Sequence, residues 1–242
     1  MPLARAVRKS FVDHLEELRW RLIASLAAIA IFSVAAYFFS APILEFLITP
    51  LQRLGDYTLF FHSPYEAFLA RLKAALFTGI FAASPVIFTE IWLFMVPGLH
   101  KSERRVGLLL ILASFLLFLM GAAFSFWLLL PWGLDFFMSF QTDSVRPLLS
   151  IGPYFSFLVG MILACGVLFD LPVILLGLVG MGILKSETLR KKRKWVIVSF
   201  FVVSAVLTPT TDPATQILLT IPLVLLYEAC VLIAGWLEKR KG

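Results

Sequence analysis

Two acidic residues in basic surroundings are the first candidates for chemistry. Glu103 follows the turn signal Pro97-Gly98 and lies in a short, cation-rich loop between two apolar runs. Bunched Lys and Arg residues beside apolar runs mark the cytoplasmic side of a membrane. A carboxylate held there is a candidate for half of a docking site for a positively charged peptide. Glu17 has a similar setting, in the basic arm formed by residues 1–21.

The composition places both acids in a membrane protein. Hydrophobic residues make up 60% of the 242 residues, charged residues only 15%, and the mean hydropathy is +0.94. A soluble domain cannot bury that much apolar surface, so we expect an all-α integral membrane protein. The net charge of +6 could suggest nucleic acid binding. However, the cations lie between apolar runs, which is typical of membrane topology, and we expect no nucleic acid partner.

The apolar runs predict six transmembrane helices within residues 22–237. An amphipathic arm, residues 1–21, is expected to lie on the cytoplasmic membrane surface, and residues 238–242 form a cytoplasmic tail. Of the 21 Lys and Arg residues, 17 lie in segments that this arrangement places inside and four in segments outside. This bias predicts that both termini are cytoplasmic. The six expected spans are about 22–39, 74–96, 106–131, 154–183, 195–208 and 214–237.

The fifth expected span is short. Only 14 residues separate Lys194 from Pro209. A helix of that length reaches about 21 Å, whereas the hydrocarbon core of a bilayer is about 30 Å thick. Such a helix must thin the bilayer around it or be shielded by neighbouring helices.

Acidic residues also occur inside the expected spans. Asp170 lies near the middle of the fourth span, where a charged Asp costs at least about 2.5–3.5 kcal/mol on insertion scales. We expect it to line a cavity and to contact a partner helix or couple to the proton gradient. The structural alternative is a hydrogen bond to a neighbouring helix. Glu90 and Glu228 lie nearer the inner ends of their spans, which favours a structural role for them.

Two other function classes fit parts of this pattern. A proton-coupled small-molecule secondary transporter would also hold acids within the membrane, but the chain shows no duplicated half and no matching pair of interrupted helices. An intramembrane hydrolase needs a nucleophile and a base within the membrane. His14, His62 and His100 lie outside the expected spans, and GxSxG and HExxH motifs are absent from the sequence. We therefore expect no enzymatic activity, no cofactor and no metal site.

Short motifs along the chain occur in an order and spacing typical of one family. In chain order they are His14–Leu22 (HLEELRWRL), Ser84-Pro85-Val86-Ile87, Phe94–Leu99 with Glu103-Arg104-Arg105, Phe169-Asp170-Leu171-Pro172, Thr208-Pro209 with Asp212 and Gln216, and Leu226-Tyr227-Glu228. Together these motifs resemble TatC, the multispanning receptor subunit of the twin-arginine protein translocase. The resemblance extends over essentially the whole chain.

The resemblance implies both a fold and a function. The fold is a glove-shaped protein of six transmembrane helices with a concave face and short helices five and six. The function is Sec-independent translocation of folded proteins across the bacterial cytoplasmic (inner) membrane. The chain would bind twin-arginine signal peptides, contact membrane lipids, and assemble with further copies of itself and with the single-span proteins TatA and TatB.

The resemblance also implies roles for individual residues. The acids that bind the signal fall on Glu17 and Glu103, and we expect Arg19 and Phe94 beside them. The residues expected to be polar within the membrane, for partner contact or coupling, are Asp170, Gln216 and Glu90. The residues expected to have structural roles are Pro50, Pro85, Pro97, Pro209 and Asp212. The sequence departs from the family pattern in three places: Asp170 replaces the usual Glu, Glu90 replaces a common Gln, and the 209–216 turn is one residue longer.

The chemistry of the signal explains why two acids are needed. A twin-arginine motif presents two planar guanidinium groups, each able to form paired hydrogen bonds with a carboxylate, which a Lys ammonium cannot do. Glu17 and Glu103 would supply the two carboxylates from the same side of the membrane. The structural alternatives are a pair between Glu103 and an adjacent Arg, and an i,i+4 pair between Glu17 and Arg21. In the second case, the signal would displace Arg21.

Overall fold

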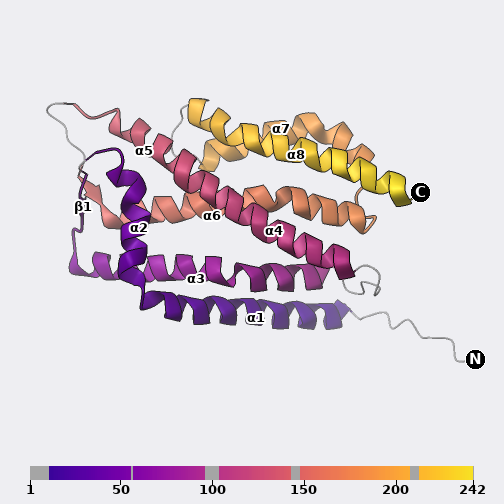
Figure 1. Cartoon of the computed structure of the whole chain (residues 1–242), viewed down its shortest axis with the longest axis horizontal. Helices are drawn as coiled ribbons and strands as arrows, with labels where there is room; N and C mark the ends of the chain where they lie inside the picture. Colours follow the sequence, from indigo (N-terminus) through magenta and orange to yellow (C-terminus); the bar gives the residue numbers. More distant parts are fainter. Residues whose placement is uncertain (1–10, 56, 96–103, 143–147, 208–212, 242) are drawn as a thin grey trace, which may run out of the picture.

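The computed structural model describes residues 11–55, 57–95, 104–142, 148–207 and 213–241, and it is almost entirely helical (Figure 1). The helices are α1 (Phe11–Tyr37), α2 (Ser40–Gln52), α3 (Pro64–Met95), α4 (Arg104–Phe124), the π-helical turn η1 (Ser125–Leu129), α5 (Leu130–Met138), α6 (Ile151–Gly180), α7 (Ser186–Leu207) and α8 (Pro213–Lys241). Two short strands, β1 (Leu59–Phe60) and β2 (Leu149–Ser150), pair in parallel.

Five stretches of the described residues are long and apolar enough to cross a membrane. This confirms the expected multispanning, all-α membrane protein. The helix α7 is not among the five, because its first half carries the basic residues up to Lys194 and only its second half is apolar. The short fifth span expected from the sequence would fall on that second half, and it stays a prediction. The five stretches are Asp13–Tyr37, Pro64–Met95, Gly107–Met138, Ile151–Gly180 and Thr215–Trp236.

The helices run between two ends of the molecule, as Figure 1 shows. α1 and α4 begin, and α3 and α8 end, at what we call the arm end. α2, β1 and the first turns of α3 lie at the opposite end, which we call the strand end. α1 packs along α3, α4 crosses α6, and α7 packs against α8. The chain therefore begins α1 and finishes α8 at the same end.

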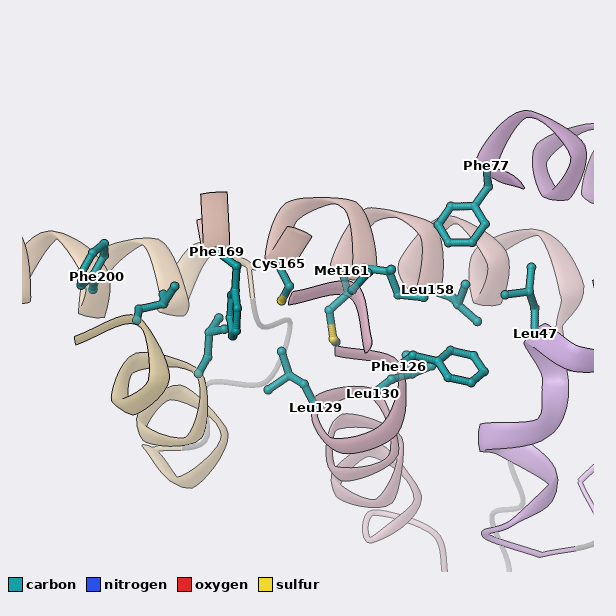
Figure 2. Close-up of a cluster of buried hydrophobic side chains, with 14 of the residues drawn as sticks. Leu47, Phe77, Phe126, Leu129, Leu130, Leu158, Met161, Cys165, Phe169 and Phe200 are labelled. Carbon is teal, nitrogen blue, oxygen red and sulfur yellow. The ribbon is translucent and has the colours of Figure 1, made fainter. Parts of the chain in front are cut away.

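The helix α6 forms the centre of the hydrophobic core. Its buried side chains include Leu158, Met161, Cys165 and Phe169. Figure 2 shows these side chains in one cluster with others from α2, α3, η1, α5 and α7. By contrast, the apolar window of α1 has no buried residue, so most of this helix offers its apolar surface to lipid.

Small residues let the helix backbones approach each other closely. A Cβ atom at Gly79 of α3 would lie only 2.7 Å from the Cα atom of Ser33 in α1. A Cβ atom at Gly177 of α6 would lie 2.3 Å from the ring of Trp92 in α3. Both glycines are therefore contact points between helices, as is common in membrane proteins, where packing replaces the hydrophobic effect between helices.

One acid joins the segments at the strand end. The Glu66 carboxylate, in the first turn of α3, accepts hydrogen bonds from the backbone N–H of His62 (2.8 Å), the backbone N–H of Gly152 (3.0 Å) and the hydroxyl of Ser150. It thus links the start of α3 to β2 and the start of α6. These contacts explain why α3 begins at Pro64, ten residues before the expected second span.

Candidate functional site

Three charged side chains from α1 and α3 meet at the arm end. The Arg21 guanidinium donates from Nη2 (2.6 Å) and Nε (3.2 Å) to Oε1 of Glu17, one helical turn earlier. Its Nη1 atom donates to Oε2 of Glu90 in α3, at 3.0 Å. The i,i+4 pair of Glu17 and Arg21 was one of the alternatives expected from the sequence. The contact with Glu90 is an addition that the structure supplies.

The charged cluster is partly shielded from water. The side chains of Arg21, Glu17 and Glu90 are 20%, 18% and 23% exposed. Ion pairs at such sites are stronger than fully exposed ones, which are worth only about 0–1 kcal/mol. Two carboxylates surround one guanidinium, so the three groups together carry one negative charge. The carboxylates of the cluster thus outnumber its guanidinium by one.

Aromatic stacking extends this contact toward the start of α1. The ring of His14 stacks on the ring of Phe94, with centroids 4.4 Å apart and planes 11° from parallel. Phe94, which the sequence analysis placed near the signal site, therefore lies beside the arm. Arg19 is exposed, and it forms no ion pair within the part of the chain that the structure describes.

Several residues singled out by the sequence lie outside the described residues, namely Glu103, Pro97, Pro209 and Asp212. The chain constrains where the segment containing Glu103 attaches. α3 ends at Met95 and α4 begins at Arg104, and both helix ends lie at the arm end, where α1 begins (Figure 1).

Asp170 lies in a buried polar network between helices. Its side chain is buried in α6, and the residue is 7% exposed. The hydroxyl of Ser114 in α4 interacts with the Asp170 carboxylate and accepts a hydrogen bond from Nε1 of Trp92 in α3 at 3.0 Å. Oδ1 of Asp170 accepts no hydrogen bond from any described residue. The network thus includes the helix contact expected as the structural alternative and leaves one acceptor atom available.

The remaining candidate residues have local contacts. Nε2 of Gln216 donates to the carbonyl oxygen of Phe201 at 2.8 Å, which ties α8 to α7. Glu228 pairs with Arg193 at 2.9 Å between the same helices. Pro50 and Pro85 lie inside α2 and α3. Among the described residues, His, Cys, Asp and Glu side chains form no group of three or more that could hold a metal ion.

An apolar cavity of about 640 Å³ opens between α2, α3, α4–η1 and α6. Its walls include Phe46, Phe81 and Trp127, and Thr78 is the polar side chain among its lining residues. All of these helices except α2 are apolar enough to span a membrane, and the apolar lining of the cavity suits an apolar helix or an acyl chain.

Sequence reasoning missed three contacts of these networks: Glu90 with Arg21, His14 with Phe94, and Ser114 with Asp170. Each contact joins residues on different helices, so the spacing of residues along the sequence does not predict it. A signal did exist for Glu66, because Ser63-Pro64-Tyr65-Glu66 matches the S-x-x-E capping box with Pro at the first helical position.

Comparisons of this chain with known proteins find matches in one family. The family model for TatC, the Sec-independent protein translocase protein, matches residues 13–222. A TatC protein of Desulforapulum autotrophicum is 37% identical over 99% of this chain and 89% of its own length. A TatC protein of Aquifex aeolicus is 38% identical over 95% of both chains. A crystal structure of a twin arginine translocase receptor, TatC, superposes with a TM-score of 0.78 at 37% identity, covering 92% of this chain and 98% of that one. The chain therefore belongs to the TatC family of Sec-independent protein translocase proteins.

Proposed function

We propose that Glu17 is a carboxylate with which this chain binds an arginine of twin-arginine signal peptides. Membership of the TatC family gives the wider function, a transport role in Sec-independent protein translocation. The observation that carries the proposal is the bond between Glu17 and Arg21. The Glu17 carboxylate already receives two N–H groups of one guanidinium, at 2.6 and 3.2 Å. An arginine of a signal peptide offers the same donors.

We propose Glu103 as the second carboxylate of this site. It directly precedes the first residue of α4, Arg104, which begins at the arm end. A twin-arginine motif needs two acceptors, because each guanidinium can occupy one carboxylate. Phe94 and His14, stacked between the arm and the end of α3, would flank the bound peptide. The exposed Arg19 would lie near the same peptide.

The membrane arrangement is proposed from charge and geometry together. The 17 cations in the expected inside segments favour a cytoplasmic arm end. The beginning of α1 and the end of α8 share that end, which supports cytoplasmic positions for both termini (Figure 1). With the apolar half of α7 as a short fifth span, the chain would cross the bacterial inner membrane six times. The 640 Å³ cavity would form part of the concave face of a glove-shaped molecule.

TatA and TatB are the proposed partners, together with further copies of this chain and membrane lipids. Asp170 would contribute through the carboxylate oxygen that receives no hydrogen bond from described residues. Its role would be contact with a partner helix or coupling to the proton gradient, as intramembrane acids commonly serve. Gln216, in the first turn of α8, would supply a further polar contact.

Photocrosslinking tests the proposed site. Probes placed at positions 17 and 103 should label a twin-arginine precursor, and replacing both signal arginines with lysines should reduce the labelling strongly. A probe at Glu187, exposed on a different segment, serves as the control for non-specific contact. Labelling at positions 17 and 103 that is indifferent to the two arginines would remove the receptor assignment.

A further inference from the structure

We propose that Arg21 keeps its ion pair with Glu90 when Glu17 releases it and binds the signal arginine. Arg21 then contacts one carboxylate instead of two, and we call this exchange the handover. This inference rests on the proposed function, since it describes how the Glu17 site is vacated. It makes Glu90 a positioning residue, because it acts on the peptide through Arg21 and Glu17.

The guanidinium geometry allows such an exchange. Arg21 uses one edge, Nε and Nη2, for Glu17 and a different nitrogen, Nη1, for Glu90. Breaking the contacts with Glu17 therefore leaves the 3.0 Å bond to Glu90 in place. Glu17 can turn toward a peptide without any movement of the α3 backbone.

Burial explains why the second carboxylate matters. Arg21 is only 20% exposed, and removing one partner of a shielded ion pair leaves the other charge poorly compensated. Without Glu90, freeing Glu17 would leave Arg21 with no carboxylate in contact among the residues that the structure describes. With Glu90, Arg21 keeps a carboxylate partner before and after the peptide binds. The exchange thus replaces one pair with another of the same kind.

The charge of the cluster favours the same outcome. Glu17, Glu90 and Arg21 sum to one negative charge, whereas Gln at position 90 would give a neutral cluster. A cationic peptide is attracted more strongly to the first than to the second, a screened contribution that does not depend on Arg21 and should stay below about twofold in Kd. Arg21 itself is the competitor for Glu17, so its removal should tighten peptide binding.

Peptide affinity in a double-mutant cycle tests the handover. The purified full chain in lipid nanodiscs is titrated with a fluorescent synthetic twin-arginine signal peptide, and the Kd is read by anisotropy. We expect R21Q to lower the Kd about three- to fivefold and E90Q to raise it by a similar factor. In the R21Q background, E90Q should change the Kd by less than about twofold, because there is no Arg21 left to hold.

The control variants change the same charges elsewhere. Glu187 and Lys191 form an exposed i,i+4 pair at 2.7 Å on α7, so E187Q and K191Q should leave the Kd unchanged. If R21Q does not purify as a folded protein, R21K takes its place. It retains the charge but loses the fork-shaped contact, and it should lower the Kd about twofold.

The outcomes separate this inference from the proposed function. An E90Q effect of equal size with and without Arg21 would overturn the handover, as would an R21Q or R21K protein that is folded but binds more weakly. If E17Q abolishes binding while the cycle is additive, the proposed function stands and the handover fails. If E17Q binds like the wild type, the proposed function itself fails.

Discussion

At the scale of single side chains, the arm end is organised by three charged groups on two helices. Glu17 and Arg21 are one turn apart in α1, and Glu90 reaches them from α3. A shielded guanidinium is stable when carboxylates neutralise it and accept its N–H groups. Here two carboxylates share one guanidinium. The ion pair between Glu17 and Arg21 links successive turns of α1. The ion pair between Arg21 and Glu90 joins α1 to α3.

The buried acid Asp170 provides a prediction at this scale. D170N and D170A should both impair export of a twin-arginine precursor in cells that depend on this chain, because each removes the ionisable group. S114A, which removes only the hydroxyl that contacts Asp170, should impair export less. The measurement is the fraction of precursor processed and exported. Undiminished export with both Asp170 variants would show that the acid has no functional role.

Sequence reasoning reached some of these contacts and not others. The pair of Glu17 and Arg21 follows from helical spacing, so the sequence predicts it without a fold. The contact between Arg21 and Glu90 spans 69 positions and depends on the register of α1 against α3. Apolar periodicity does not fix that register when most of α1 faces lipid. The stacking of His14 on Phe94 escaped prediction for the same reason.

At the scale of helices, the packing of α1 on α3 depends on a close backbone approach. G79A would place a Cβ atom 2.7 Å from backbone atoms of Ser33, so one helix must move. We expect a loss of about 1–3 kcal/mol of stability, which is the usual effect of overpacking. The check is thermal unfolding of the purified protein in detergent.

Gly160 supplies a matched control for that prediction. A Cβ atom there would meet no atom within 4 Å, and the residue is exposed on α6. G160A should be neutral or slightly stabilising, by up to about 1 kcal/mol, because Ala favours helix more than Gly does. Equal unfolding temperatures for G79A and G160A would contradict the close approach.

The contact of α7 with α8 at the arm end should depend on pH. The Ser186 hydroxyl and backbone N–H donate hydrogen bonds to Glu238 and lower the pKa of its carboxyl from the ordinary value. A lowered folded pKa means that the stabilisation is fully present above the unfolded pKa, about 4.3, and is lost as the pH falls through the folded pKa.

Comparing the wild type with E238Q measures this effect. The wild type should have the higher unfolding temperature at about pH 7, and the difference should shrink as the pH falls below the unfolded pKa of about 4.3 and through the lowered folded pKa. A difference that stays constant over this range would show that the Glu238 charge does not hold α7 to α8.

The ends of two helices differ from the spans that the sequence predicts. Hydropathy places the second span at about 74–96, but α3 begins at Pro64 because Glu66 ties its first turn to β2 and α6. Likewise, the helix that starts at Arg104 continues through the π-helical turn η1 to Met138. Both extensions still lie within stretches that are long and apolar enough to cross a membrane, Pro64–Met95 and Gly107–Met138. Apolar runs in the sequence therefore find each helix but misplace its ends.

At the scale of the whole molecule, the two ends are distinct and their sides of the membrane can be measured. Single cysteines replace Thr142, exposed near the strand end, and Glu187, exposed near the arm end. In spheroplasts, a membrane-impermeant maleimide should label position 142 at once and position 187 only after permeabilisation. The native Cys165 and Cys230 are buried and give little background. The reverse pattern would invert the proposed topology.

The overall architecture was accessible from the sequence to a large extent. Composition and apolar runs indicate a multispanning helical protein, and the motifs around Glu17, Glu103 and Asp170 indicate the TatC family, which the comparisons confirm. The short apolar half of α7 was also evident from the distance between Lys194 and Pro209. What the sequence could not give is which helices touch. That depends on small-residue contacts such as Gly79 on Ser33, which leave no periodic pattern.

Binding of a twin-arginine peptide by wild type and E17Q tests the central claim most directly. The wild type should bind the Arg-Arg peptide at least about tenfold more tightly than the Lys-Lys version, because only guanidinium groups form the forked contact with a carboxylate. E17Q, checked for correct folding by size-exclusion chromatography, should bind both peptides weakly and nearly equally. The account is contradicted if E17Q keeps the full preference for the Arg-Arg peptide.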